Sequence, residues 1–287
     1  MQSIIDRGAV LVTGASSGMG RSCALRLVRG GYRVFAAVRK ERDAESIREE
    51  GISGLQPVIL DVTDVSSISR AAQVVGQAMG ETGLAGLVNN AGIAVTGPVE
   101  LVPLDEFRRQ FEVNLFGQVA VTQAFLPLIR TARGRIVNVG SVGAKFALPF
   151  ASPLNASKAA FELTSDALRM ELRPWGIHVA LICPGSIKSG AEKKLEDDSE
   201  KTLETYTAGG LELYGSSYRS FVLGMLRLEA RGVGPEVMAE AVFHAISARI
   251  PKLRYPVGPK SRLLPFLFGS LPMAAADTFR LRLFGVR

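Results

Sequence analysis

The sequence predicts a doubly wound α/β fold, in which a parallel sheet of about seven strands is covered by helices on both faces. Short runs rich in Val, Ile and Leu alternate with longer helical patterns from residue 9 to about 185. These runs are too apolar to be half solvated, as is typical of strands buried on both faces of a sheet. Strand–helix alternation of this length indicates parallel strands joined by right-handed crossovers.

Six strands are expected in this part of the chain, with helical patterns such as 66–79 and 105–131 between them. The expected strands are residues 9–13, 33–38, 57–60, 86–89, 135–139 and 178–182. The regularity ends after Gly185, where a lid rich in polar residues and glycine is expected to be helical. A helix over 235–248, a strand over 253–257 and an apolar, basic tail follow.

The composition is that of a folded globular chain. Of the 287 residues, 47% are hydrophobic and 21% are charged, which excludes disordered and collagen-like proteins. Cys23 and Cys183 lie in apolar runs, so we expect free thiols in a reducing, cytoplasmic compartment. Two cysteines and two histidines scattered along the chain do not form a zinc site of any usual spacing, so we predict no metal.

The net charge of +7 suits an anionic partner. No motif that reads RNA or DNA accompanies this charge, so nucleic acid is not an expected partner. In the tail, basic residues flank the apolar segments 263–268 and 279–284. Such a tail either rests on an anionic membrane surface as a peripheral contact, or packs over the substrate cleft or a neighbouring subunit.

A glycine-rich turn follows the first expected strand and opens the first helix. It reads Thr13-Gly-Ala-Ser-Ser-Gly-Met-Gly20. Glycines allow a tight turn, and the helix N-terminus then presents free N–H groups to phosphate. The turn therefore predicts dinucleotide binding by a Rossmann-type sheet. The contacts are assigned to Gly14, Ser16, Ser17, Gly18, Met19 and Gly20.

The end of the second expected strand carries cations where NAD-binding sheets place an acidic residue for the ribose 2′-hydroxyl. Arg39 and Lys40 stand there, and the first acidic residue, Glu41, comes behind both. A guanidinium group can donate two parallel hydrogen bonds to phosphate oxygens, so Arg39 favours a 2′-phosphate. We therefore predict that NADP(H) is preferred over NAD(H).

The chain is expected to form one domain over residues 1–287. Its parts are a dinucleotide-binding core over about 8–185, a substrate lid over about 186–233 and a C-terminal extension over about 234–287. No repeat and no linker divides them.

Further short motifs follow the expected strands in order. They are Asp61-Val62, Asn89-Asn-Ala-Gly92, Gly140-Ser141 and Pro184-Gly185, with Asn114 in the long helix and Ser157-Lys158 in the next one. Together with the glycine-rich turn they resemble the short-chain dehydrogenase/reductase family, in particular its branch of 17β-hydroxysteroid and retinol dehydrogenases. The resemblance covers about residues 8–260 and implies a homodimer or homotetramer.

The resemblance implies cofactor contacts beyond the glycine-rich turn. Asp61 and Val62 would hold the adenine ring. The turn after the fourth strand would line the adenosine, through Asn90, Ala91 and Gly92. The segment after the sixth strand would cover the nicotinamide, through Pro184, Gly185, Ile187 and Ser189.

It also implies catalytic roles. Ser141 would hydrogen-bond the substrate oxygen, Lys158 would bind the nicotinamide ribose, and Asn114 would support Lys158 through backbone and water. The family's proton donor is a tyrosine four residues before the lysine and thirteen after the serine. Both counts reach Leu154, which has no ionisable group. Loss of a general acid costs on the order of 10² to 10⁴ in rate.

Two hypotheses follow. The first is an NADPH-dependent oxidoreductase that transfers hydride to or from a lipophilic carbonyl or alcohol, with a substitute acid. Candidate acids are Lys145 and the lid tyrosines Tyr206, Tyr214 and Tyr218. The second is a protein of the same fold that binds NADP(H) but catalyses a non-redox step, such as an isomerisation or cyclisation, or only binds or senses a ligand.

Overall fold

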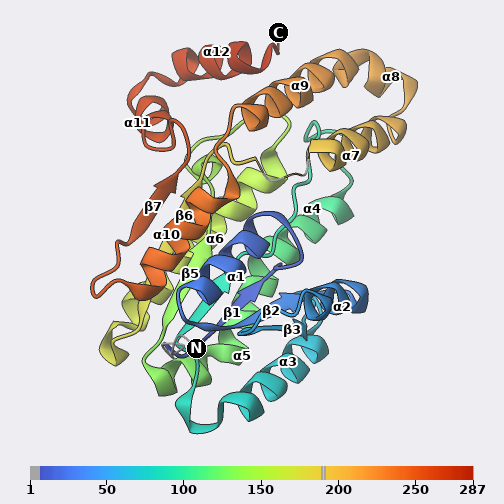
Figure 1. The fold of residues 1–287 in the computed structure, drawn as a ribbon. Coiled ribbons are helices and arrows are strands. Elements are labelled where there is room, and N and C mark those ends of the chain that lie inside the picture. Colours follow the sequence, from blue (N-terminus) through green and yellow to red (C-terminus); the bar gives the residue numbers. More distant parts are fainter. Residues whose placement is uncertain (1–6, 189, 191, 287) are drawn as a thin grey trace.

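The computed structural model describes residues 7–188, 190 and 192–286. Within these residues, seven parallel strands form one sheet in the order β3-β2-β1-β4-β5-β6-β7 (Figure 1). The strands are β1 (Ala9–Thr13), β2 (Arg33–Val38), β3 (Leu55–Ile59), β4 (Gly86–Asn89), β5 (Arg135–Val139), β6 (His178–Pro184) and β7 (Arg254–Val257). The predicted fold class is confirmed, and strand boundaries differ from the prediction by at most two residues.

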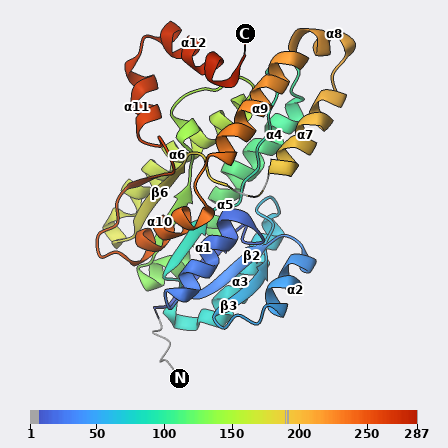
Figure 2. The ribbon, with the colours of Figure 1, turned by 45° about the horizontal axis from the view of Figure 1, so that its top comes forward.

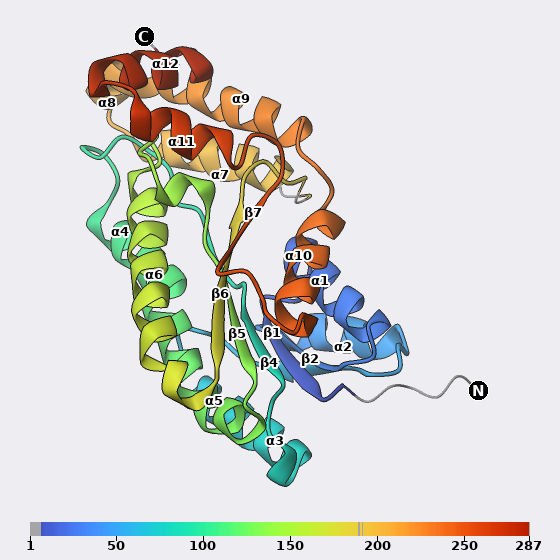
Figure 3. The ribbon, with the colours of Figure 1, turned by 90° about the vertical axis from the view of Figure 1, so that its left-hand side faces the viewer.

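Helices cover both faces of this sheet, as Figure 3 shows. Helices α1, α2 and α10 pack on one face, and α3, α5 and α6 pack on the other. The helices are α1 (Gly18–Arg29), α2 (Glu41–Glu49), α3 (Val65–Met79), α4 (Leu104–Phe111), α5 (Gly117–Ala132), α6 (Ser152–Glu171), α7 (Glu192–Glu204), α8 (Ala208–Gly210), α9 (Ser216–Ala230), α10 (Pro235–Ser247), α11 (Leu263–Ser270) and α12 (Met273–Phe284).

Strand β1 shows why the strands read as continuous apolar runs. All five of its residues are buried. Val10 and Val12 belong to the core under α1 and α10, whereas Ala9 and Leu11 belong to the core under α3 and α5. Because successive side chains point to opposite faces, both sets must be apolar in a sheet that is covered twice.

The strand order reverses between β1 and β4. From β1 the chain builds outward to β2 and β3, and from β4 it builds in the other direction to β7. The loops after β1 and β4 therefore part from each other at the carboxyl edge of the sheet and leave a crevice there. The motifs singled out in the sequence follow strands and lie at this edge.

Helices α7, α8 and α9 extend beyond the carboxyl edge, and α11 and α12 lie beside them at the same end (Figures 1 and 2). This end has its own apolar core, which includes Tyr206, Tyr218, Phe221 and Phe284. The ring of Phe284 lies 5.2 Å from that of Phe221, centroid to centroid, so α12 is packed onto α9. The division into core, lid and extension remains a prediction.

One expected helix is interrupted. The pattern over 105–131 predicted a single helix, but α4 ends at Phe111 and α5 begins at Gly117, with a π-helical turn, Glu112–Phe116, between them. Asn114 in this turn is buried, and its side-chain amide hydrogen-bonds the backbone of Ile93. A tertiary contact therefore sets the local geometry.

The apolar run 263–276 divides at Leu271 and Pro272, between α11 and α12. In the described part of the chain, no helix combines the length and the apolar character that crossing a bilayer requires.

Candidate active site

The turn after β1 is shaped by the close approach of backbone to backbone. Gly14 and Gly18 have φ of 64° and 53°, a region that side chains other than glycine rarely adopt. A Cβ on Gly14 would lie 2.9 Å from Cα of Ala91, and one on Gly20 would overlap the carbonyl oxygen of Gly14. The turn thus requires glycine at these positions, as the motif predicted.

The first turn of α1 is arranged to receive an anion. Ser17 precedes the helix without capping it through its side chain, and the first turn holds no acidic residue. Gly14, Ser16 and Ser17 are exposed, whereas Met19 is half-buried. Backbone N–H groups at a helix N-terminus attract phosphate. The cradle therefore fits the diphosphate of a dinucleotide, and Gly14 to Gly20 would hold it.

The loop after β4 is tied to the glycine-rich turn. The Oγ1 of Thr13 accepts hydrogen bonds from the backbone N–H groups of Asn90 (2.9 Å) and Ala91 (3.0 Å). The side-chain amide of Asn90 donates to the carbonyl of Thr13 at 2.9 Å. Gly92 is exposed, and a Cβ there would lie 3.3 Å from Oδ1 of Asn114. The predicted adenosine contacts and the glycine-rich turn form one rigid unit.

The neighbouring strand ends supply the next groups along the edge. Arg39 and Lys40 follow β2 and are both exposed. Val62, after β3, is buried, and the Asp61 carboxylate accepts hydrogen bonds from the backbone and hydroxyl of Thr63 at 2.9 and 2.7 Å. Because β2 and β3 are adjacent, the two cations and the Asp61-Val62 pair share one end of the crevice.

On the other side of the crevice, the segment after β6 turns back over the sheet. Pro184 ends the strand, and Gly185 donates its N–H to the carbonyl of Val257 at 2.8 Å. Ile187 is buried and forms a β-bridge with Val233. Ser189, predicted to contact the cofactor, lies outside the described residues.

The predicted catalytic residues lie at the end of β5 and on α6. Ser141 is half-buried, and its Oγ accepts a hydrogen bond from the N–H of Gly143 at 3.0 Å. The Lys158 ammonium donates to the carbonyl of Val139 at 2.6 Å. Burial lowers the pKa of Lys158 from 10.5 to about 8, against the opposing pull of Glu162. Ser141 and Lys158 thus meet the same strand end.

Asn114 has a different set of partners from the one predicted. Its Oδ1 accepts from the N–H of Ile93 at 2.9 Å, and its Nδ2 donates to the carbonyl of the same residue at 3.0 Å. Asn114 therefore fixes the loop after β4. Its support of Lys158 remains a prediction.

Leu154 lies on the first turn of α6, one turn before Lys158, and is half-buried. Its carbonyl accepts a hydrogen bond from the hydroxyl of Ser157 at 3.0 Å. The neighbouring Asn155 donates its amide to the carbonyl of Gly143 at 2.7 Å. The start of α6 is thus held in place, but Leu154 brings no exchangeable side-chain proton to it.

Three of the four substitute acids suggested by the sequence have other partners, whereas the buried hydroxyl of Tyr206 has no hydrogen-bond partner among the described residues. Tyr218 is fully buried and its hydroxyl lies 2.7 Å from Oγ1 of Thr96. Tyr214 donates to Glu100 at 2.6 Å, and the Lys145 ammonium lies 2.9 Å from Oε2 of Glu162. The pKa of each of the three lid tyrosines is raised, chiefly by burial in Tyr206 and Tyr218 and by the hydrogen bond to Glu100 in Tyr214.

A family model described as short chain dehydrogenase matches residues 8–200. The chain belongs to the short-chain dehydrogenase family. The match spans the whole of the sheet up to β6, including the glycine-rich turn, Ser141 and Lys158.

Individual relatives agree. Retinol dehydrogenase 7 of Rattus norvegicus is 38% identical over 275 residues, which cover 94% of this chain and 85% of the relative. The NADPH-dependent 3-dehydrocapnine reductase of Ornithobacterium rhinotracheale is 33% identical over 272 residues, or 93% and 94% of the two chains. The crystal structure of a short-chain dehydrogenase from Streptomyces avermitilis has a TM-score of 0.75 and 28% identity, and the match covers 96% of each chain.

The predicted resemblance to the branch with retinol dehydrogenases is therefore confirmed. This short-chain dehydrogenase belongs to a family of oxidoreductases that bind a nicotinamide cofactor.

Sequence reasoning missed Glu162, a buried acidic residue that contacts both ends of the segment from Ser141 to Lys145 after β5. Its side chain is 1% exposed and contacts Lys145, Arg254 and the backbone of Ser141. The available signal was an acidic residue four positions after Lys158, on the helix face that the lysine shares.

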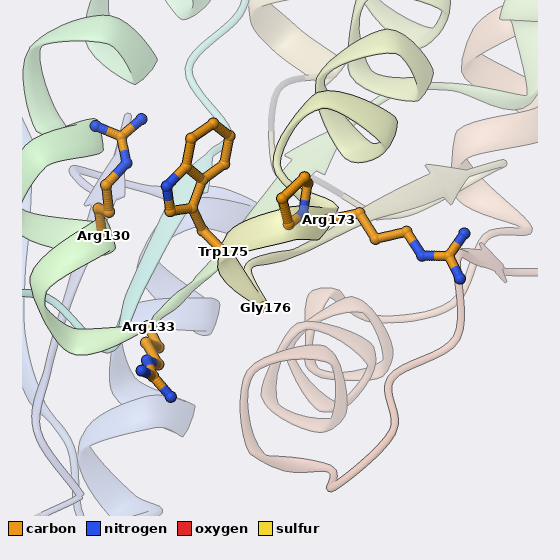
Figure 4. A pocket seen from close by; sticks show the side chains of 6 residues that line it. Arg130, Arg133, Arg173, Trp175 and Gly176 are labelled. Atoms are coloured by element: carbon orange, nitrogen blue, oxygen red, sulfur yellow. The ribbon is translucent and has the colours of Figure 1, made fainter.

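A second basic region lies at the opposite edge of the sheet. A shallow concavity opens before the amino ends of β5 and β6, with the guanidinium of Arg130 4.9 Å from the centre of the Trp175 ring (Figure 4). It is lined by Arg130, Arg133, Arg173, Pro174, Trp175 and Gly176. Trp175 is 48% exposed. Cofactors of doubly wound sheets bind at the other, carboxyl edge.

Proposed function

We propose that this protein is an NADP(H)-dependent oxidoreductase that acts on a lipophilic carbonyl or alcohol. The observation that carries the cofactor preference is the pair of exposed cations, Arg39 and Lys40, at the end of β2. An acidic residue there would repel a 2′-phosphate, whereas a guanidinium group binds it with two hydrogen bonds. The NADPH dependence stated in the name of the Ornithobacterium relative supports the same choice.

The proposed cofactor contacts follow the carboxyl edge of the sheet. The diphosphate lies on the turn from Gly14 to Gly20 and the adenine on Asp61 and Val62. Asn90, Ala91 and Gly92 line the adenosine, and Pro184, Gly185, Ile187 and Ser189 cover the nicotinamide. When bound, the nicotinamide supplies or accepts the hydride.

The catalytic part of the proposal uses three side chains. Ser141 donates its hydroxyl hydrogen to the substrate oxygen and so polarises the carbonyl. Lys158 binds the nicotinamide ribose, and Asn114 holds the loop after β4 in its position beside Lys158. Leu154 occupies the position of the family's phenol, so proton transfer depends on another group.

A lipophilic substrate is supported by the composition of the lid. Its core is rich in aromatic side chains that include Tyr206, Tyr218 and Phe221, and Phe150 after β5 lies 5.8 Å from the Tyr218 ring, centroid to centroid. The name of the retinol dehydrogenase relative points to the same substrate class.

Two further parts of the proposal concern partners. Basic and apolar residues of the C-terminal helices, such as Arg262 and Phe266, are exposed and suit peripheral contact with an anionic membrane. A homodimer or homotetramer is proposed from the family.

The decisive experiment compares NADPH consumption by the unmodified protein and by Leu154→Tyr on a panel of lipophilic ketones and aldehydes. Turnover by the unmodified protein supports the proposal and requires an acid other than the missing phenol. Turnover by Leu154→Tyr alone means that hydride transfer is intact but the native site lacks an acid.

The second candidate is a protein that binds NADP(H) but catalyses a non-redox step or only binds a ligand. The apolar side chain of Leu154 favours it, as do the other partners of Tyr214 and Tyr218. It predicts NADPH binding without consumption on the same panel, together with specific binding of a lipophilic ligand.

A further inference from the structure

A buried carboxylate with an unusual set of neighbours lies beneath the catalytic turn. Glu162 on α6 is 1% exposed, and its Oε2 lies 2.9 Å from Nζ of Lys145 and 2.6 Å from the guanidinium of Arg254. Its Oε1 accepts from the N–H of Ser141 at 3.4 Å. A carboxylate out of water is costly unless it is paired in this way, so these contacts fix its position.

Glu162 holds both ends of the segment from Ser141 to Lys145. It contacts the backbone of the first residue and the ammonium of the last. A Cβ at Gly140 would lie 2.5 Å from Oε1 of Glu162, so glycine is needed to admit the carboxylate. The carboxylate thus determines how the Ser141 hydroxyl is presented at the end of β5.

Lys158 lies one helical turn before Glu162 on the same face of α6. Its ammonium donates to the carbonyl of Val139, two residues before Ser141. Burial lowers the pKa of Lys158 to about 8, and the negative charge of Glu162 opposes this change. Lys158 therefore changes charge near neutral pH, as an efficient general acid or base does.

The other polar groups of this turn and of the start of α6 are held by partners of their own. The amide of Asn155 bonds Gly143 and the hydroxyl of Ser157 bonds the carbonyl of Leu154. Lys145 is paired with the same oxygen of Glu162 that binds Arg254 on β7, away from the carbonyl that Lys158 contacts.

We propose that Lys158 is the proton donor of this active site and that Glu162 is the positioning residue that keeps it charged and places Ser141. The proposal rests on the function proposed above. In the reducing direction, the hydride would come from the reduced nicotinamide of NADPH, which would lose a C–H bond and be oxidised as a C–H bond forms at the carbonyl carbon, and the oxygen takes a proton from the Lys158 ammonium. An N–H bond breaks, an O–H bond forms, and the neutral amine is reprotonated by water. In oxidation the neutral amine accepts the hydroxyl proton.

Three charged groups and one neutral thiol lie around this pair. Lys145 follows the turn after β5, Arg254 belongs to β7, and Asp166 on α6 binds the other side of the Arg254 guanidinium at 2.5 Å. The Cys183 thiol of β6 lies 3.7 Å from Oε1 of Glu162, and burial raises its pKa to about 12, so it stays neutral. Glu162 is the charged group in this set that raises the pKa of Lys158.

The first test separates proton donation from cofactor binding. Lys158→Arg keeps a cation for the ribose, but a guanidinium group does not release its proton near neutral pH. We expect kcat on a carbonyl probe such as phenanthrenequinone to fall by about 10² or more, while the Kd for NADPH changes less than about tenfold. In a Leu154→Tyr background the phenol supplies the proton, so the same substitution costs less than about tenfold in kcat.

Equal losses of kcat in the two backgrounds, or a loss of NADPH affinity that matches the loss of kcat, overturn the proposal, because Lys158 then serves only the cofactor. Turnover by Leu154→Tyr with none by the unmodified protein also overturns it, since the native site then contains no acid.

The second test needs no substrate. The fraction of Lys158 in its neutral form is measured against pH by competitive acetylation with acetic anhydride and mass spectrometry of its peptide. We expect Glu162→Gln to lower the pKa of Lys158 by about one unit. Lys145→Gln removes an exposed cation and is expected to raise it. Asp166→Asn alters a partner of Arg254 but contacts neither Ser141 nor Lys158. It is the matched control and should leave the pKa of Lys158 unchanged.

These results distinguish failure of the proposal from failure of the proposed function. If no variant consumes NADPH, the oxidoreductase function fails on that panel, and acetylation still decides the role of Glu162. A pKa of Lys158 that is the same in Glu162→Gln and Lys145→Gln overturns the proposal. If Glu162→Gln does not fold, the pKa of Lys158 in Lys145→Gln decides the test. The Lys145 side chain is 44% exposed, so its replacement should not prevent folding.

Discussion

The two ends of the candidate site are built from different interactions. At the cofactor end, the loops after β1 and β4 are joined by neutral hydrogen bonds between Asn90 and Thr13 and by close packing at Gly14. At the catalytic end, Lys158 lies near a buried carboxylate, Glu162, that is paired with further cations.

The difference separates binding from chemistry. The proposed diphosphate cradle consists of neutral hydrogen bonds and backbone shape, neither of which depends on the residue at position 154. Proton transfer depends on the charge of a few side chains, so one substitution changes the reaction without changing the cradle. The predictions below test this separation, beginning with the largest expected effect.

Ser141→Ala is expected to lower kcat by about 10² to 10³, because it removes the hydrogen bond to the developing oxyanion. NADPH affinity stays within about threefold, since no part of the cradle changes. Stopped-flow NADPH oxidation and fluorescence titration measure the two quantities. Ser152→Ala, which removes a buried hydroxyl without a partner on the same helix as Lys158, is the control. A matching loss of NADPH affinity in Ser141→Ala would contradict the separation.

Gly20→Ala acts at the other end. Its Cβ would overlap the carbonyl oxygen of Gly14, so the turn must open. We expect the Kd for NADPH to rise about 10²-fold, close to 3 kcal/mol. Gly76→Ala on α3 has a nearest neighbour 3.9 Å from its Cβ and serves as the matched control. Circular dichroism checks that both variants fold, and an unchanged Kd in Gly20→Ala would mean that the cofactor lies elsewhere.

Arg39→Asp tests the preference for NADP(H). Reversing the charge at the end of β2 repels the 2′-phosphate, and the Kd for NADPH should rise by about tenfold or more, while that for NADH should not. Arg42→Asp makes the same charge change three residues later, where the side chain is 76% exposed, and is expected to alter neither constant. Equal effects of the two substitutions would reduce the role of Arg39 to general electrostatics.

Lys158→Met is expected to stabilise the fold at neutral pH. Because burial lowers the pKa of Lys158 from 10.5 to about 8, the folded protein carries a costly buried charge below pH 8. Between pH 8 and 10.5 the folded state releases the proton first, so the unmodified protein gains stability as the pH rises. The variant should be more stable by about 1 to 2 kcal/mol at pH 7, with a gain that shrinks toward pH 10.

Urea unfolding between pH 7 and 10 measures the difference in free energy of unfolding between Lys158→Met and the unmodified protein. Lys40→Met, at an exposed position, is the control and should show none. A loss of stability in Lys158→Met at pH 7 would show that the hydrogen bond to Val139 outweighs the burial of the charge.

The cofactor end could be predicted from the sequence because its determinants are local. Gly14, Gly18 and Gly20 meet steric limits of a single turn, and Arg39 lies at a strand end that the apolar pattern locates. The doubly wound parallel sheet also follows from strand–helix alternation and handedness, and the structure confirmed it.

The catalytic end could be predicted only in part because its determinants are distant in sequence. Glu162 depends on Arg254, 92 residues later, for its buried charge, and no local pattern shows that pairing. The π-helical turn at Asn114 is set by Ile93, 21 residues earlier, so helix periodicity alone predicted an unbroken helix. The partners of Tyr214 and Tyr218 likewise come from the loop after β4.

The packing of α12 on α9 has a practical consequence for experiments on this protein. A Cβ at Gly224 would lie 2.8 Å from the ring of Phe284, so the last turn of α12 is part of the apolar core that it shares with α9. Shortening the chain before Phe284 would expose the aromatic side chains of α9 to water. Expression work is better served by affinity tags at the N-terminal end, and chimaeras that exchange substrate preference should move α9 and α12 together.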